Sequence, residues 1–107
     1  MPDGAVRIVA ALVNAEVSPE AEFVTLLNTT NKTIALQGWH IADRDKNKQA
    51  LGGSLPAGET LRVKLQPPVV LPNKGGLITV LNAKGLRVDG VSYTAEQAKL
   101  PGFTLKF

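Results

Sequence analysis

The residues best suited to chemistry lie together in the segment GWHIADRDKNKQALGG, residues 38–53. It holds the chain's only tryptophan and only histidine, followed by the run Asp43-x-Asp45-x-Asn47. These oxygen-bearing residues match the first, third and fifth positions of an EF-hand loop, whose alternating ligands converge on Ca²⁺. The match ends there, because Lys48 stands where the loop needs Gly and no bidentate Glu follows. The segment therefore predicts a hairpin with a solvated, charged tip, and no metal site.

His40 is the only imidazole that could act as a general base. A catalytic triad would need Ser54 or Ser92 together with Asp43 or Asp89, and neither serine lies in a nucleophile-elbow sequence. On a strand, the imidazole points away from the apolar side chains on either side of it, and so towards solvent. We therefore expect no catalytic residue and no cofactor. A hydrolase, either His-based or metal-dependent, is kept as the enzyme alternative.

Basic side chains form the pattern best suited to a partner. Arg44, Lys46 and Lys48 alternate along the segment, so in an extended conformation they share one face. Arg62 and Lys64 repeat the spacing on a later strand. If the two segments lie side by side, five positive charges could follow a phosphate backbone and give weak, salt-dependent nucleic-acid binding. A solvated face explains the same residues and is favoured, because few aromatic rings exist for base stacking.

Short strands must position these residues. Apolar or alternating segments recur with Pro, Gly and Asn between them, which predicts an all-β antiparallel sandwich or barrel of about eight or nine strands. The expected strands are Ala5–Asn14, Glu22–Asn28, Thr33–Leu36, Trp39–Asp43, Gln49–Leu51, Glu59–Lys64, Leu77–Asn82, Leu86–Tyr93 and Phe103–Lys106.

Turn chemistry separates these strands. PAG (56–58), LPNKGG (71–76) and NAKG (82–85) supply fixed or positive φ, and the last is expected to form a hairpin turn. Thr94 and Gln97 have capping-box spacing, which predicts one short helical turn before the last strand.

Length and composition bound the class of protein. A chain of 107 residues with a net charge of +3 predicts one domain, residues 1–107, which could be the C-terminal part of a longer parent. No cysteine is present, so a disulfide or thiolate site is excluded. The longest apolar run, residues 8–13, is too short to span a bilayer or to make a usual signal peptide. We expect no membrane insertion, and a cytoplasmic location if Met1 is the native start.

The ordered motifs resemble a known family. EFVTLLNTTNKTIALQGWHIADRDKN, then LPAGETLRV, then LPNKGGLITVLNAKGLRVDGVSYT resemble the lamin-tail domain, with the last block the most specific and an ending similar to bacterial members. The resemblance covers nearly the whole chain. It implies an immunoglobulin-like β-sandwich without the antibody disulfide, in which Trp39 is a core residue at a sheet corner.

The resemblance also implies a non-catalytic interaction module that contacts a protein partner or targets an attached catalytic domain, such as a nuclease or hydrolase. It supplies no ligand and no oligomeric state. Residues 5–14 are the segment expected to accept another chain by strand addition, because both faces are apolar; burial of both faces within the domain is the alternative. One face would carry Val6, Ile8, Ala10 and Leu12, and the other Val9, Ala11 and Val13.

Overall fold

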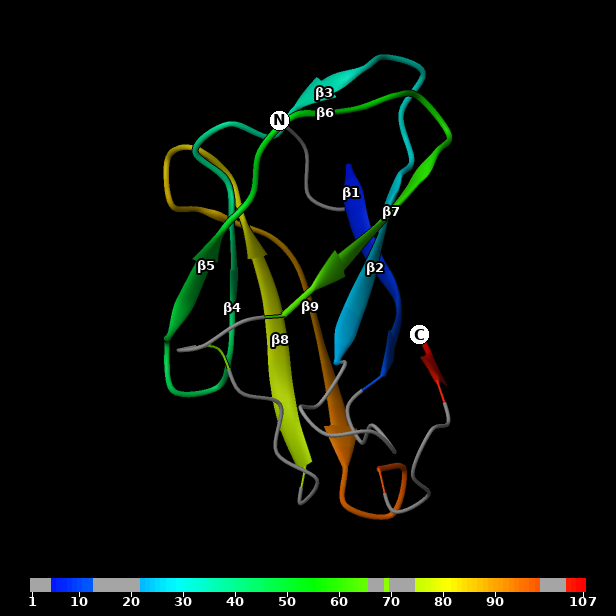
Figure 1. Ribbon diagram of the computed structural model, residues 1–107, viewed down its shortest axis with the longest axis vertical. Coiled ribbons are helices and arrows are strands. Elements are labelled where there is room, and N and C mark those ends of the chain that lie inside the picture. Colours follow the sequence, from blue (N-terminus) through cyan, green and yellow to red (C-terminus); the bar gives the residue numbers. More distant parts are fainter. Residues whose placement is uncertain (1–4, 13–21, 66–68, 70–74, 99–103) are drawn as a thin grey trace.

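The computed structural model describes residues 5–12, 22–65, 69, 75–98 and 104–107. Within these residues the chain is all β, and no helix there is long and apolar enough to cross a membrane. Figure 1 shows the strands, which are β1 (Val6–Leu12), β2 (Phe23–Asn28), β3 (Ile34–Ala35), β4 (His40–Ala42), β5 (Lys48–Ala50), β6 (Ser54–Leu55), β7 (Thr60–Lys64), β8 (Gly75–Leu81), β9 (Arg87–Thr94) and β10 (Leu105–Lys106).

Two four-stranded antiparallel sheets pack against each other. Their strand orders are β10-β1-β2-β7 and β5-β4-β8-β9, and the β3–β6 pair lies at one end (Figure 1). Alternate residues of both sheets point into one core, because successive side chains of a strand face opposite sides. The fully buried apolar side chains include Ile8, Val24, Leu26, Leu36, Ile41, Leu55, Ile78 and Val80. The predicted immunoglobulin-like β-sandwich is confirmed.

All nine predicted strands have a counterpart in the described residues, and most ends differ by one or two positions. β6 is a tenth strand that the sequence did not predict, because its two residues, Ser54 and Leu55, are too few to show periodicity. Residues 13, 14 and 103 of the expected first and last strands lie outside the described part of the chain. Trp39 is buried as predicted, at 4% exposure, where Gly38 turns the chain with φ +84°.

The structure changes two expectations for residues 5–14. A β-bulge between Ile8 and Ala10 shifts the register of β1 against β2, so the fully buried side chains are Val6, Ile8 and Ala11 and not a strict alternating set. β1 is also an internal strand where Ala10 and Ala11 pair with β10, so strand addition is closed there. Val13 of the other expected face lies outside the described residues.

Two turn predictions are confirmed. In the β8–β9 hairpin, Asn82 Oδ1 accepts hydrogen bonds from the Lys84 and Leu86 amides, and Gly85 has φ +76°. After β9, the Thr94 amide donates to Gln97 Oε1 and the Gln97 amide donates to Thr94 Oγ1, at 2.8 and 3.2 Å. This reciprocal pair is the capping box that the spacing predicted.

Candidate interaction surface

The β4–β5 turn is built around a buried carboxylate. Asp43 is 5% exposed, and its Oδ1 accepts from the backbone amides of Asp45 and Asn47 at 2.9 and 3.0 Å. Its Oδ2 accepts from Asn47 Nδ2 at 3.1 Å. The predicted position of Asp43 in a solvated tip is therefore wrong. The D-x-D-x-N spacing lets a short side chain satisfy backbone amides two and four residues later, so it makes a turn of the Asx type.

Replacing Asp43 with alanine is expected to lower the free energy of unfolding by about 2 kcal/mol, because two backbone amides lose a charged acceptor. Asp45→Ala is the matched control, since Asp45 is exposed in the same turn and should change stability by less than about 0.5 kcal/mol. Urea unfolding of both variants measures the difference. Equal losses would show that Asp43 does not organise the turn.

This turn also changes the expected arrangement of the basic residues. Residues 43–47 lie between the strands, and Lys46 has φ +67°, so Arg44, Lys46 and Lys48 do not alternate along an extended strand. Arg44 and Lys46 are exposed in the turn, whereas Lys48 begins β5 and pairs with Ala42 of β4. The prediction that Arg44, Lys46 and Lys48 share one face of an extended strand is therefore wrong. Their positions are set by the turn.

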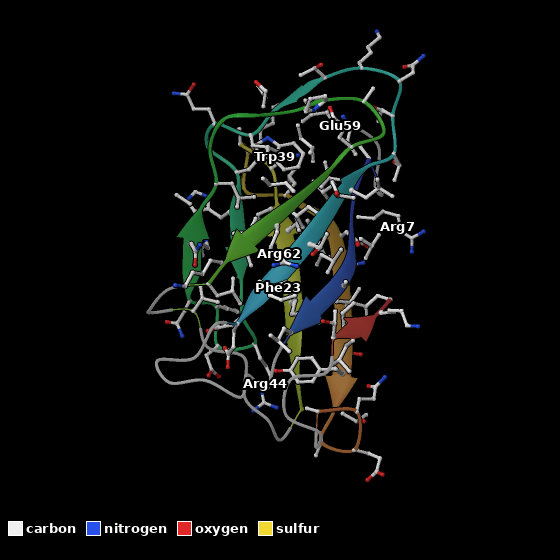
Figure 2. All side chains as sticks on the ribbon, turned by 45° about the vertical axis from the view of Figure 1, so that its right-hand side comes forward. Arg7, Phe23, Trp39, Arg44, Glu59 and Arg62 are labelled. Atoms are coloured by element: carbon white, nitrogen blue, oxygen red, sulfur yellow. The ribbon has the colours of Figure 1, made fainter. Side chains whose placement is uncertain are left out.

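Arg62 and Lys64 lie on β7, an end strand of the other sheet. Their side chains are exposed, and the Arg62 guanidinium lies over the Phe23 ring, 4.2 Å from its centroid, in a cation–π contact (Figure 2). The Arg62 guanidinium is therefore in contact with the outer face of its own sheet, through the Phe23 ring.

One hydrogen bond connects the two basic segments. Gln49 Nε2 on β5 donates to the Lys64 carbonyl on β7 at 2.9 Å, so the end strands of the two sheets are neighbours at this point. Lys48 faces outward from one sheet beside Ala42, and Lys64 faces outward from the other beside Phe23. We call Arg44, Lys46, Lys48, Arg62 and Lys64 the basic surface. It extends around the β5–β7 edge of the sandwich and does not lie on one flat face.

A depression of about 350 Å³ lies beside the β4–β5 turn, on the outer face of the β5-β4-β8-β9 sheet. Three of the basic residues line it, and β8 supplies its apolar side chains. We call it the basic groove, and its described lining residues are Ala42, Asp43, Arg44, Lys46, Lys48, Leu77, Thr79 and Leu81.

The sequence reasoning missed the contribution of β8 to this site. Ile78 and Val80 are fully buried in the core, while Leu77 and Leu81 alternate with them and so face outward. An antiparallel strand with one solvated face normally alternates apolar and polar residues. In the run GLITVL, residues 76–81, two of the three outward positions are leucines around Thr79, which was the available signal for a surface with a second role.

The elements considered for catalysis are kept apart. His40 pairs with Leu81 of β8, whereas Ser92 pairs with Leu77, about 13 Å further along the same strand. Ser54 lies in the separate β3–β6 pair. His40 lies on the outer face of its sheet, as predicted, but its side chain is half-buried and not fully exposed to solvent.

The two candidate carboxylates have structural partners. Asp89 Oδ2 accepts a hydrogen bond from the Ile8 amide at 2.8 Å and so connects β9 to β1 across the sandwich. Asp43 accepts hydrogen bonds from backbone amides of the β4–β5 turn. Within the described ranges, no group of three or more His, Cys, Asp or Glu residues is placed to hold a metal ion. The carboxylates of Asp43 and Asp89 therefore have structural roles as hydrogen-bond acceptors for backbone amides.

The facing antiparallel sheets and their single core define an immunoglobulin-like β-sandwich domain. The family model of the lamin tail domain matches residues 2–95, which is most of the chain, and the chain therefore belongs to the lamin tail domain family. Lamin tail domains are immunoglobulin-like domains that often serve as interaction modules. No curated protein sequence matches the chain.

Proposed function

We propose that the domain is a non-catalytic interaction module whose basic surface binds acidic proteins, either separate partners or other parts of a longer parent chain that bears a catalytic domain. The observation that carries the proposal is the basic surface itself. Three cationic side chains line a depression on one sheet and two lie on the outer face of the other, and the Gln49–Lys64 hydrogen bond joins the two sheets at the edge between them. Charged surfaces of one sign steer oppositely charged partners and favour them over others.

A capture experiment tests this function. The immobilised domain is compared with a variant carrying Arg44→Glu, Lys46→Glu and Lys48→Glu, using extract with and without nuclease treatment. The matched control reverses three exposed charges elsewhere, at Arg7, Lys32 and Lys84. We expect nuclease-resistant protein capture that the first variant loses and the control keeps. Equal loss in both variants would mean that only net charge matters, and would contradict the proposal.

Nucleic-acid binding is the second candidate, because the same basic surface could follow a phosphate backbone around the β5–β7 edge. It predicts capture that disappears after nuclease treatment. It also predicts weak binding to a labelled duplex that falls steeply with salt. The cation–π contact of Arg62 and the few aromatic side chains favour the protein partner over this candidate.

A further inference from the structure

The basic groove combines two features that together specify a ligand. Its floor is formed by Leu77, Thr79 and Leu81 of β8 beside Ala42 of β4, and it is apolar apart from the Thr79 hydroxyl. Leu77 is 39% exposed, and it pairs with Ser92 of β9 just beyond the Ala42–Thr79 pair that ends the pairing of β4 with β8. Apolar area left open beside an organised turn would be stabilised by a partner's apolar side chain.

The rim of the groove is cationic. Arg44 and Lys46 project from the turn, and Lys48 lies on the same face as Ala42 because the two are cross-strand partners. Two acidic residues are close by. Asp43 is 5% exposed and its oxygens accept hydrogen bonds from the turn, so its charge is directed into the protein, which leaves Asp45 as the exposed acid of the turn. Three cations against one exposed carboxylate leave the rim positive.

We propose that the basic groove binds an extended acidic segment of a partner protein, with one large apolar side chain seated on Leu77 and flanking carboxylates paired with Arg44, Lys46 and Lys48. This partner class depends on the proposed role of the domain as a protein-interaction module. The volume of about 350 Å³ is at the lower end of the roughly 300–1,000 Å³ found for ligand pockets, which suits an anchoring side chain. Carboxylates from the segment would replace water around the three cations.

The groove favours a peptide over other occupants. A phosphate backbone would satisfy the rim but would leave the leucine floor uncovered, and none of the described lining residues has an aromatic ring for base stacking. A second copy of this chain would bring like charge to the rim, since the chain carries a net charge of +3. Where β8 lies between β4 and β9, at residues 79–81, recognition would use side chains and not strand addition.

The probe is a fluorescently labelled peptide of alternating acidic residues and leucines, followed by anisotropy. One comparison peptide has Asp and Glu replaced by Asn and Gln, and another has Leu replaced by Ser. We expect binding of the acidic, leucine-containing peptide to weaken as salt rises, and both comparison peptides to bind roughly tenfold more weakly or worse.

Two variants of the protein test the two halves of the groove. Leu77→Ser removes an apolar side chain from the floor of the groove, and Lys46→Glu reverses one charge of its rim. Each variant is expected to bind the peptide roughly tenfold more weakly. Their matched controls are Leu86→Ser, at another exposed large apolar residue of the described ranges, and Lys32→Glu, at an exposed lysine outside the groove. Neither control should change binding, and circular dichroism verifies that each variant is folded.

The outcomes separate this proposal from the proposed function. If the peptide binds equally well to Leu77→Ser and Lys46→Glu, the groove is not its site and the proposal is overturned. If extract proteins are still captured through the basic surface while Leu77→Ser has no effect on them or on the peptide, the interaction module stands and the apolar anchor fails. A labelled duplex that displaces the peptide and binds more tightly also overturns it, in favour of a phosphate ligand.

Discussion

Replacing Asn28 with alanine is expected to lower the free energy of unfolding by about 3–4 kcal/mol. Asn28 ends β2 and is fully buried, and its side chain makes four hydrogen bonds. Nδ2 donates to the carbonyls of Lys32 and Leu55 at 2.7 and 2.8 Å. Oδ1 accepts from the Thr30 amide and hydroxyl at 2.9 and 2.7 Å. Alanine would leave the buried Leu55 carbonyl and the partly buried groups of Thr30 and Lys32 without this partner.

Two further variants make the prediction specific. Asn28→Asp keeps the size and the acceptor, but an ionised carboxylate cannot donate and would face the Lys32 and Leu55 carbonyls, so we expect a loss at least as large. Asn31→Ala, at an exposed asparagine in the same connection, should cost less than about 0.5 kcal/mol. Urea unfolding gives all three values. A stable Asn28→Asp protein would show that the two donated hydrogen bonds contribute little.

Much of the fold could be predicted because its information is local. Alternation gave the strands, and Asn82 with Gly85 gave the β8–β9 turn. The capping box at Thr94 and Gln97 depends on spacing alone, and both of its hydrogen bonds are present. These features involve residues two to four positions apart, where side-chain chemistry and backbone geometry decide the conformation together.

The cationic residues of the candidate site were predicted from their spacing, but the basic groove could not be, because it depends on contacts between distant segments. The basic groove exists because β4 pairs with β8, which places Ala42 beside Thr79 and His40 beside Leu81. No local pattern sets that pairing. The error at the turn has a different cause. Alternation assumed an extended chain from residue 43 onward, but the Asp43 carboxylate competes for the backbone amides and closes a turn instead.

The bulge in β1 is a third feature that differs from the prediction. Period-two reasoning places Ala10 inside with Ile8, but one extra residue, Val9, stands between two registers and reverses the faces after it. The Val9 carbonyl accepts from the Phe107 amide at 3.0 Å, so the bulge is held by the far end of the chain. A sequence window around β1 contains none of this information.

Alkaline solution is expected to destabilise the domain through Tyr93, by about 3 kcal/mol as pH rises from about 10 to about 12. Burial, and then the negative charge of Glu22, raise the pKa of Tyr93 from 10.0 to about 12, while Arg44 acts in the opposite direction. A raised pKa means that the folded state holds the phenolic proton more tightly than the unfolded state does. The corresponding stability is therefore fully present below pH 10 and is lost as pH rises through 12.

The packing of Tyr93 explains why ionisation is costly. Tyr93 is 4% exposed and pairs with Gly76 of β8, and a Cβ atom at Gly76 would lie 2.7 Å from the tyrosine hydroxyl oxygen and 3.0 Å from Cζ. The phenol ring therefore lies over the glycine, and this leaves little room for water around a phenolate. A buried phenolate beside the negative charge of Glu22 would be poorly solvated.

Tyr93 is the chain's only tyrosine, so tyrosinate absorbance reports this group alone. We expect its transition near pH 12 in the folded protein, and at lower pH in Glu22→Gln, which removes the negative charge that favours the neutral phenol. Tyr93→Phe keeps the ring and serves as the control for lysine titration, so the difference in unfolding free energy between the two proteins should change with pH only above about 10. A transition near pH 10 while circular dichroism still shows folded protein would mean that burial does not perturb this phenol, and parallel pH profiles for the two proteins would remove Tyr93 as the cause of alkaline unfolding.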